Sequence, residues 1–158
     1  MSHVARAPRH QAAIALSTLL VACGGSATTQ PSAEDRSPSS EVFGQDEGRG
    51  YSDAARYGDL VWTAGHLPEA ASPGDDVARQ TEAVMDGLQA TLEEAGAGFD
   101  TVVMTNVYLT DFNTWPEFNA VYTGYFEDRL PPRVTVEISE LGFGDIEISM
   151  VAYVRDSH

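Results

Sequence analysis

Arg133 occupies a position from which an arginine could bind a small carboxylate. It directly follows Pro131 and Pro132, which cannot donate backbone hydrogen bonds to a ladder and therefore belong at the entrance of a strand. An arginine there is held on stiff backbone at a sheet end, where its guanidinium can form a bidentate hydrogen-bonded pair with a carboxylate. Such a charge-assisted pair contributes about 1.5–3 kcal/mol net. The plain alternative is an arginine that is solvated or paired with Glu137.

Two alternating segments within residues 131–154 must position this arginine, and a short Gly-containing loop joins them. Alternation with a period of two predicts β-strands. The apolar positions of the two strands are Val134, Val136, Ile138, Ile146, Ile148, Met150, Ala152 and Val154. If both strands belong to one sheet whose apolar face is covered by helices, Arg133 and Glu147 share the uncovered face.

The preceding elements follow from turn and cap residues. Tyr57-Gly58-Asp59 predicts a hairpin between strands at 52–56 and 60–65. Asp75 and Asp76 predict the start of a helix whose apolar face reaches Ala95, and Gly96 predicts its end.

A β-branched run at 101–109 predicts a central strand. Thr114 and Glu117 predict a capping box for a second helix. The aromatic and apolar stripe of that helix, which favours a core role, is Phe118, Val121, Tyr122, Tyr125 and Phe126. The order ββαβαββ predicts an α+β domain with a mixed sheet, two helices on one face, and a bare face that oligomerisation would bury.

Composition limits the classes of function. The chain has 158 residues, 42% of them hydrophobic, and a net charge of −15, and all nine of its Lys and Arg residues are arginine. So acidic a surface disfavours nucleic-acid binding because it repels phosphates. One cysteine, four histidines without metal-ligand spacing and no Gly-rich phosphate loop predict no disulfide, metal, haem or nucleotide.

The N-terminus predicts export. Residues 1–22 combine Arg6 and Arg9 with a short apolar segment, which is typical of a signal peptide. The segment ends in Leu20-Val21-Ala22-Cys23, similar to the lipobox of bacterial lipoproteins, in which Cys23 would carry the lipid. The alternatives are an ordinary secretory signal or a start codon placed too far upstream. Residues 23–50 are then a lipidated cysteine and a disordered tether, residues 51–158 are the folded domain, and the protein is a membrane-anchored lipoprotein of the cell envelope.

Four segments together resemble the Rid (YjgF) family of imine deaminases over residues 51–155. They are YSDAARYGDLVWTAGHLP, VYLTDFNTWPEFNAVYTGYF, PPRVTVEI and DIEISMVAYV. The resemblance implies a chorismate-mutase-like fold and a homotrimer with sites between subunits. It also implies cofactor-independent hydrolysis of 2-imino acids or enamines to 2-keto acids and ammonia.

The resemblance also implies roles for single residues. Arg133 would grip the substrate carboxylate with help from the backbone at Thr135, and Glu147 would orient the water. The other residues of the implied cleft are Tyr51, Gly65 and Asn119. The chain departs from many relatives at Ala64, where serine is common, at Thr135, where several have cysteine, and at His66, where glutamine is common.

Three functions are compatible with these residues. The first is an exported imine or enamine hydrolase, and the second is a noncatalytic module that binds small carboxylates through the same arginine. The third, ribonuclease activity, is disfavoured by the acidic charge.

Overall fold

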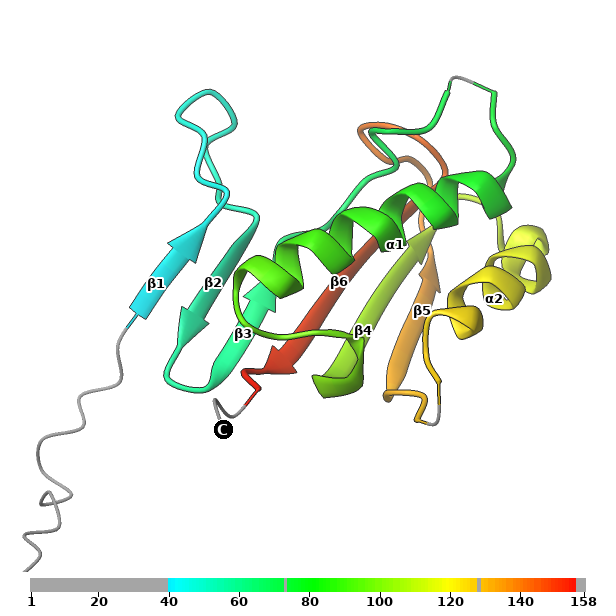
Figure 1. The fold of residues 1–158 in the computed structure, drawn as a ribbon. Helices are drawn as coiled ribbons and strands as arrows, with labels where there is room; N and C mark the ends of the chain where they lie inside the picture. The colour runs from blue at the N-terminus through cyan, green and yellow to red at the C-terminus, as the bar shows by residue number, and fades with distance from the viewer. Residues whose placement is uncertain (1–39, 73, 128, 156–158) are drawn as a thin grey trace, which may run out of the picture. The chain divides into compact units, whose positions relative to one another are not determined.

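A six-stranded mixed sheet forms the centre of the folded region (Figure 1). The computed structural model describes residues 40–72, 74–127 and 129–155, so the predicted signal peptide and Cys23 lie outside the described residues. The strands are β1 (Ser40–Phe43), β2 (Ala54–Tyr57), β3 (Leu60–Thr63), β4 (Val102–Leu109), β5 (Arg133–Glu137) and β6 (Ile146–Tyr153). Their order across the sheet is β1-β2-β3-β6-β4-β5, and only β4 and β5 are parallel. The predicted α+β fold is confirmed.

The strand connections follow the local sequence. Gly58 has φ 61° in the two-residue loop between β2 and β3, as a tight hairpin requires. The parallel pair β4 and β5 is joined through helix α2 (Trp115–Gly124), because parallel neighbours need a crossover connection. The last strand, β6, lies between β3 and β4, so it does not pair with β5, the strand before it in the chain.

Helix α1 (Val77–Glu94) begins where the sequence predicts. The Asp76 carboxylate accepts a hydrogen bond from the backbone N–H of Arg79 at 3.0 Å, and Gly96 follows the helix with φ 79°. The capping box predicted for α2 is wrong. The Thr114 hydroxyl instead donates to the carbonyl of Asp111 at 2.6 Å, because a short 3-10 turn at Phe112–Thr114 precedes the helix.

Both helices cover the same face of the sheet, and the core lies between the two layers (Figure 1). The predicted aromatic stripe of α2 contributes Phe118, Tyr122 and Phe126 to this core. The Tyr122 hydroxyl donates to the Thr105 hydroxyl of β4 at 3.1 Å, which satisfies both buried groups. Burial raises the pKa of Tyr122, so its hydroxyl keeps its proton.

The sheet begins earlier than predicted. The expected tether ran to residue 50, but β1 at Ser40–Phe43 pairs with β2, and Phe43 packs against the core. The polar, Gly-rich composition of the segment hid this short strand. The boundary predicted at Tyr51 therefore falls inside the folded region.

The predicted orientation of β5 is also wrong. Arg133 pairs with Thr105 and Thr135 with Val107, so the polar side chains of β5 share the helix-covered face. Val134 and Val136 lie on the opposite face and are 48% and 38% exposed. The reason is that the opposite face is itself apolar, so alternation alone could not tell which face the helices cover.

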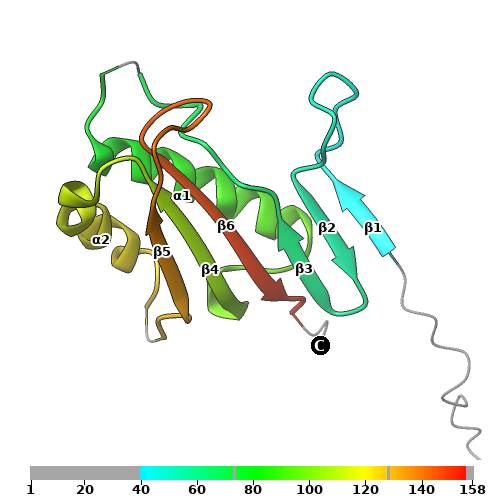
Figure 2. The ribbon, with the colours of Figure 1, turned by 180° about the vertical axis from the view of Figure 1, so that it is seen from behind.

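Figure 2 shows the sheet from the face that no helix covers. This face carries many large apolar side chains. Strand register places together on it the exposed residues Tyr57, Leu60, Trp62, Val134, Val136 and Tyr153. A patch of this extent on a sheet is typical of a protein–protein interface.

Candidate active site

Arg133 lies in a cage of aromatic rings at the edge of the helical layer. Its guanidinium carbon is 4.7 Å from the ring centre of Tyr122, 5.0 Å from that of Phe118 and 5.8 Å from that of Trp115. The negative faces of such rings attract a cation by about 0.5–2 kcal/mol each, depending on burial. The rings therefore hold the guanidinium in one place without neutralising its charge.

No carboxylate within the described residues pairs with Arg133. The ion pairs found there join Arg49 with Asp53, Arg79 with Glu82, and Arg155 with Asp100. The alternative in which Glu137 neutralises Arg133 is wrong, because Glu137 instead accepts a hydrogen bond from the backbone N–H of Phe112 at 2.7 Å. Arg133 thus combines partial burial with an unpaired positive charge.

Asn119 and Thr135 complete this side of the site. The Asn119 side-chain oxygen accepts a hydrogen bond from Arg133 Nη2 at 2.9 Å, which orients the guanidinium. Thr135 is two residues further along β5, half-buried on the same face. We call Arg133, Asn119 and Thr135 the arginine half-site.

Glu147 lies on the opposite face of the sheet. It pairs with Tyr108 of β4, and its carboxylate packs directly against the backbone of Gly65. A Cβ at position 65 would displace Glu147 Oε1, so the absence of a side chain there lets the carboxylate lie against the backbone. Backbone bonds between His66 and Ile148, at 2.8 and 3.1 Å, hold this approach in place.

Glu147 and Gly65 border an open cavity of about 590 Å³, which we call the glutamate cavity. Tyr108, Ser149 and Glu140 also line it. Within the described residues the Glu147 carboxylate accepts no hydrogen bond, so it is free to bind a water molecule or a substrate.

Tyr51 lies in a neighbouring cavity of about 230 Å³ that shares Gly65 with the glutamate cavity. Its ring stacks under the guanidinium of Arg49 at 5.2 Å. His66 lines the same cavity and packs closely against Gly87 of α1. Burial lowers the pKa of His66, which favours the neutral imidazole.

The predicted site residues thus do not form one group. Arg133, Asn119 and Thr135 lie on the helix-covered side, and Glu147 lies on the opposite face beside Gly65. Tyr51 lies in a cavity that α1 also lines. The expectation that Arg133 and Glu147 share the uncovered face is wrong, because only Glu147 lies there. One chain cannot direct both side chains at the same small molecule. The aromatic cage was not predicted, because Phe118 and Tyr122 belong to the stripe that favoured a core role and Trp115 was not singled out. Of the residues around the guanidinium, only Asn119 was named in advance, from the family resemblance.

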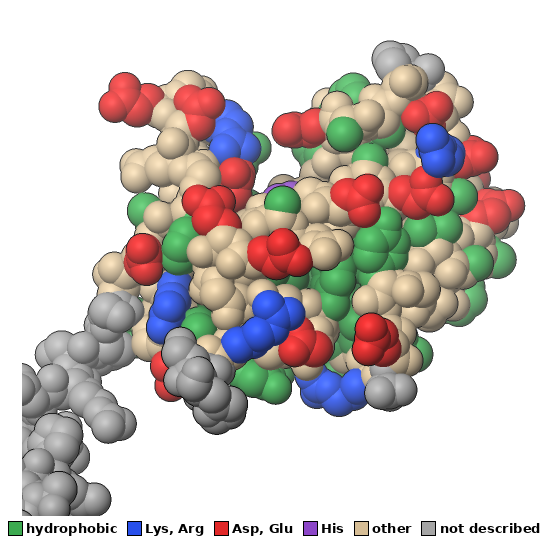
Figure 3. All heavy atoms as spheres, in the orientation of Figure 1, with side chains coloured by type: hydrophobic (Ala, Val, Ile, Leu, Met, Phe, Trp, Pro, Cys, Tyr) green, Lys and Arg blue, Asp and Glu red, His purple; other side chains and the backbone are tan. Residues whose placement is uncertain are grey.

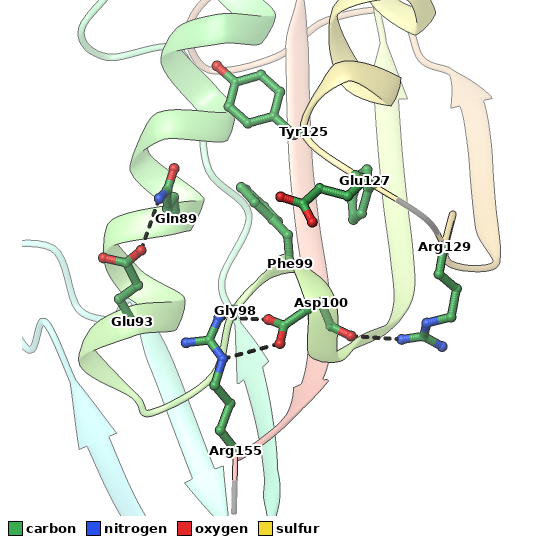
Figure 4. A pocket seen from close by; sticks show the side chains of 10 residues that line it. Gln89, Glu93, Gly98, Phe99, Asp100, Tyr125, Glu127, Arg129 and Arg155 are labelled. Carbon is green, nitrogen blue, oxygen red and sulfur yellow. Dashed lines mark hydrogen bonds and ion pairs between the residues drawn. The ribbon is translucent and has the colours of Figure 1, made fainter.

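Arg129 and Arg155 line a cavity of about 440 Å³ between the C-terminal half of α1, the segment after α2 and the end of β6 (Figure 4). Arg155 there binds Asp100 through Nη2 at 2.6 Å and Nε at 3.3 Å, and this bond lowers the pKa of Asp100. Arg129 donates to the carbonyls of Asp100 and Val102 at 3.2 and 2.9 Å. Both guanidinium groups are engaged, so this cavity is a poorer candidate for binding a carboxylate than the unpaired guanidinium of Arg133.

Acidic side chains are spread over the helical face with few arginines between them, in keeping with the net charge of −15 (Figure 3). Among the described residues there is no group of three His, Cys, Asp or Glu that could hold a metal ion. Neither of the two described helices has the length and apolar character needed to cross a bilayer.

The comparisons with known proteins all indicate the same protein family. Residues 46–154 match the family model described as Endoribonuclease L-PSP. A RutC family protein of Pyrococcus abyssi is 39% identical over 108 residues, which are 65% of this chain and 85% of that protein.

Solved structures agree. A YjgF family protein of Neisseria meningitidis has a TM-score of 0.69 at 29% identity, covering 75% of this chain and 98% of that one. A Rid family protein of unknown function from Yersinia pestis has a TM-score of 0.67 at 28% identity, covering 73% and 100%. The chain therefore belongs to the Endoribonuclease L-PSP family, whose members also carry the names YjgF, RutC and Rid.

Proposed function

We propose that this protein hydrolyses 2-imino acids, or their enamine tautomers, to 2-keto acids and ammonia. The observation that carries the proposal is the half-buried, unpaired guanidinium of Arg133, held by Asn119 and three aromatic rings. A fixed, unneutralised cation is what a small carboxylate substrate needs. The family to which the chain belongs includes enamine and imine deaminases.

The chemistry requires little beyond positioning. An imine carbon is already electrophilic, so water can add to it directly. Glu147 would take a proton from the attacking water and pass it to the imine nitrogen, which gives a carbinolamine. It would then take the hydroxyl proton and deliver it to the amine nitrogen as the C–N bond breaks, which releases the keto acid and ammonia. A well-placed general base typically contributes a factor of about 10²–10⁴ in rate.

Because Arg133 and Glu147 lie on opposite faces, the proposed site requires two copies of the chain. The exposed apolar face opposite the helices supports assembly, since burying it would stabilise an oligomer. We propose a homotrimer in which the arginine half-site of one copy meets the glutamate cavity of its neighbour.

The test is the release of keto acid and ammonia from 2-imino acids freshly generated by an amino acid oxidase. Wild-type protein is expected to exceed spontaneous hydrolysis, and Glu147→Gln to lose a factor of about 10²–10⁴ in kcat. An unchanged rate in Glu147→Gln would refute the assigned role. Tight keto-acid binding without turnover would instead favour the noncatalytic carboxylate-binding module.

Ribonuclease activity, which the family description names, is a weaker candidate. The net charge of −15 opposes binding to a phosphate backbone, and the described arginines form no basic patch. RNA cleavage that co-purifies with the protein through stringent purification, and is lost in Arg133→Ala, would overturn this ranking.

We also propose that the mature protein is exported and attached to a membrane only through a lipid on Cys23. The motif Leu20-Val21-Ala22-Cys23 at the end of an apolar segment supports this. The mass of the mature chain should show cleavage before Cys23 and an added lipid. Cys23→Ser should abolish both changes and release the protein from the membrane fraction.

A further inference from the structure

Gln80 is a buried polar residue of α1 that belongs neither to the arginine half-site nor to the lining of the glutamate cavity. Its side chain is only 6% exposed, and it lies in the first turn of the helix. A buried amide must be hydrogen-bonded, because an unpaired one costs about 1–3 kcal/mol. The partners of this amide therefore indicate what it holds together.

Those partners lie on two separate loops. Gln80 Nε2 donates to the Asp145 carboxylate at 2.9 Å and to the Asp75 carbonyl at 2.8 Å. Gln80 Oε1 accepts from the backbone N–H of Asp145 at 2.7 Å. Asp145 is thus held through both its side chain and its backbone, and the Thr110 hydroxyl binds its second carboxylate oxygen at 2.9 Å.

Asp145 ends the loop 139–144, which forms one wall of the glutamate cavity through Glu140, Leu141 and Gly142. Residues 139–144 make no hydrogen bond with any other described residue. Next to Asp145, at the same end of the loop, Gly144 has φ 68° and lies so close to Pro68 and Gln80 that a Cβ would collide with them. Gln80 therefore holds this end of the loop, together with Thr110, whose backbone N–H also donates to the Asp145 carbonyl at 3.0 Å.

We propose that Gln80 is a positioning residue that fixes the loop 139–144 against the glutamate cavity and so sets the affinity for substrate; this rests on the proposed hydrolase function. Gln80 touches neither Glu147 nor Arg133. The backbone of Glu147 is held independently by its pairing with Tyr108. Loss of Gln80 should loosen the cavity wall while leaving the proposed general base in place.

The test is Gln80→Met, which keeps the length of the side chain and removes both polar ends. The matched control is Gln89→Met, because Gln89 lies on the same helix with its amide bonded at the surface to Glu93. We expect Gln80→Met to raise KM about tenfold with kcat within about twofold, the pattern of lost substrate binding. The control should match wild type.

Three further experiments apply if Gln80→Met folds poorly or if turnover is absent. Amide hydrogen exchange of residues 139–144 should accelerate in Gln80→Met, while the C-terminal half of α1 stays unchanged. Asp145→Asn, a milder change, should shift KM in the same direction. Calorimetry with 2-oxobutanoate, a keto-acid product, should show the same loss of affinity without needing turnover.

The outcomes separate the two proposals. A wild-type protein without hydrolase activity contradicts the proposed function, whereas an active wild type with unchanged KM and exchange in Gln80→Met contradicts the role of Gln80. The role of Gln80 would also be contradicted if Gln80→Met lowered both kcat and the free energy of unfolding but left KM unchanged. Such a result would make Gln80 a general fold residue.

Discussion

Arg133 and Arg155 each lie near aromatic side chains, but their charges are used differently. Arg155 forms two hydrogen bonds to the Asp100 carboxylate and a third to the Ala97 carbonyl at 3.0 Å. Arg133 bonds to the neutral amide of Asn119 and faces only rings otherwise. The neutralised arginine ties the C-terminal segment to the 3-10 turn at Phe99–Thr101, whereas the free one keeps its charge for a ligand.

The comparison of the two arginines suggests a criterion for a candidate carboxylate site. The hydrogen-bond partner of the guanidinium is a better criterion than the number of arginines or the volume of the cavity. The cavity at Arg155 is well formed, at about 440 Å³, yet its guanidinium groups are already engaged. None of the cavities described above, within the described part of the chain, includes Arg133. In the proposed oligomer, a second copy would complete the cleft beside this free charge.

Arg133→Ala should give the largest loss among the arginine variants, about 10²-fold in kcat/KM, because a charge-assisted carboxylate contact contributes about 1.5–3 kcal/mol. Steady-state keto-acid release measures it. Arg155→Ala is the matched control and should leave kcat/KM unchanged. Equal losses in both variants would remove the distinction between the two arginines.

Mixing the inactive variants Arg133→Ala and Glu147→Gln should restore activity to about a quarter of the wild-type value. In a randomly assembled ring, that fraction of sites receives an intact arginine from one copy and an intact glutamate from the next. The mixture is prepared by joint refolding and assayed against each variant alone. Absence of recovery from folded, mixed oligomers would contradict a site shared between copies.

Asn119→Asp should convert Arg133 to the condition of Arg155 by placing a carboxylate beside it. We expect KM to rise about tenfold, because substrate must then compete with an internal anion. Asn119→Ala, which loses the orienting bond but adds no charge, should raise KM less. Equal increases in KM for the two substitutions would show that only the orienting hydrogen bond of Asn119, and not the added charge, affects substrate binding.

Asp100→Asn should have the smallest effect, a loss of under about 1 kcal/mol in unfolding free energy at neutral pH, since the pair is exposed. The Arg155 bond lowers the pKa of Asp100, so its contribution is present above the ordinary carboxyl pKa and disappears as pH falls through the lowered value. Urea unfolding should therefore show a difference from wild type at pH 7 that vanishes in acid. Activity should not change.

Much of the fold could be predicted because its signals are local. Asp76 and Gly96 bound α1 as predicted, and Ile146, Ile148 and Met150 alternate in β6 with the buried face correct. Strand β6 lies at the centre of the sheet and α1 packs against it, so each of them must have one apolar face. Periodicity is reliable under that condition.

The edge strand β5 could not be oriented from sequence, because both faces of this sheet are apolar. Arg133 reaches the helical layer only because β5 lies at the edge, where α2 leaves room for a guanidinium among its rings. The residues of the site could be named from the family resemblance. Their separation onto opposite faces required knowledge of the strand register.

The close approach of Glu147 to Gly65 makes these two positions mutationally dependent. A methyl group at residue 65 would overlap the Glu147 carboxylate in its present rotamer, so bulk added at residue 65 would turn the end of that side chain away from the backbone. A substitution at residue 65 would therefore change the position of a carboxylate that it does not replace.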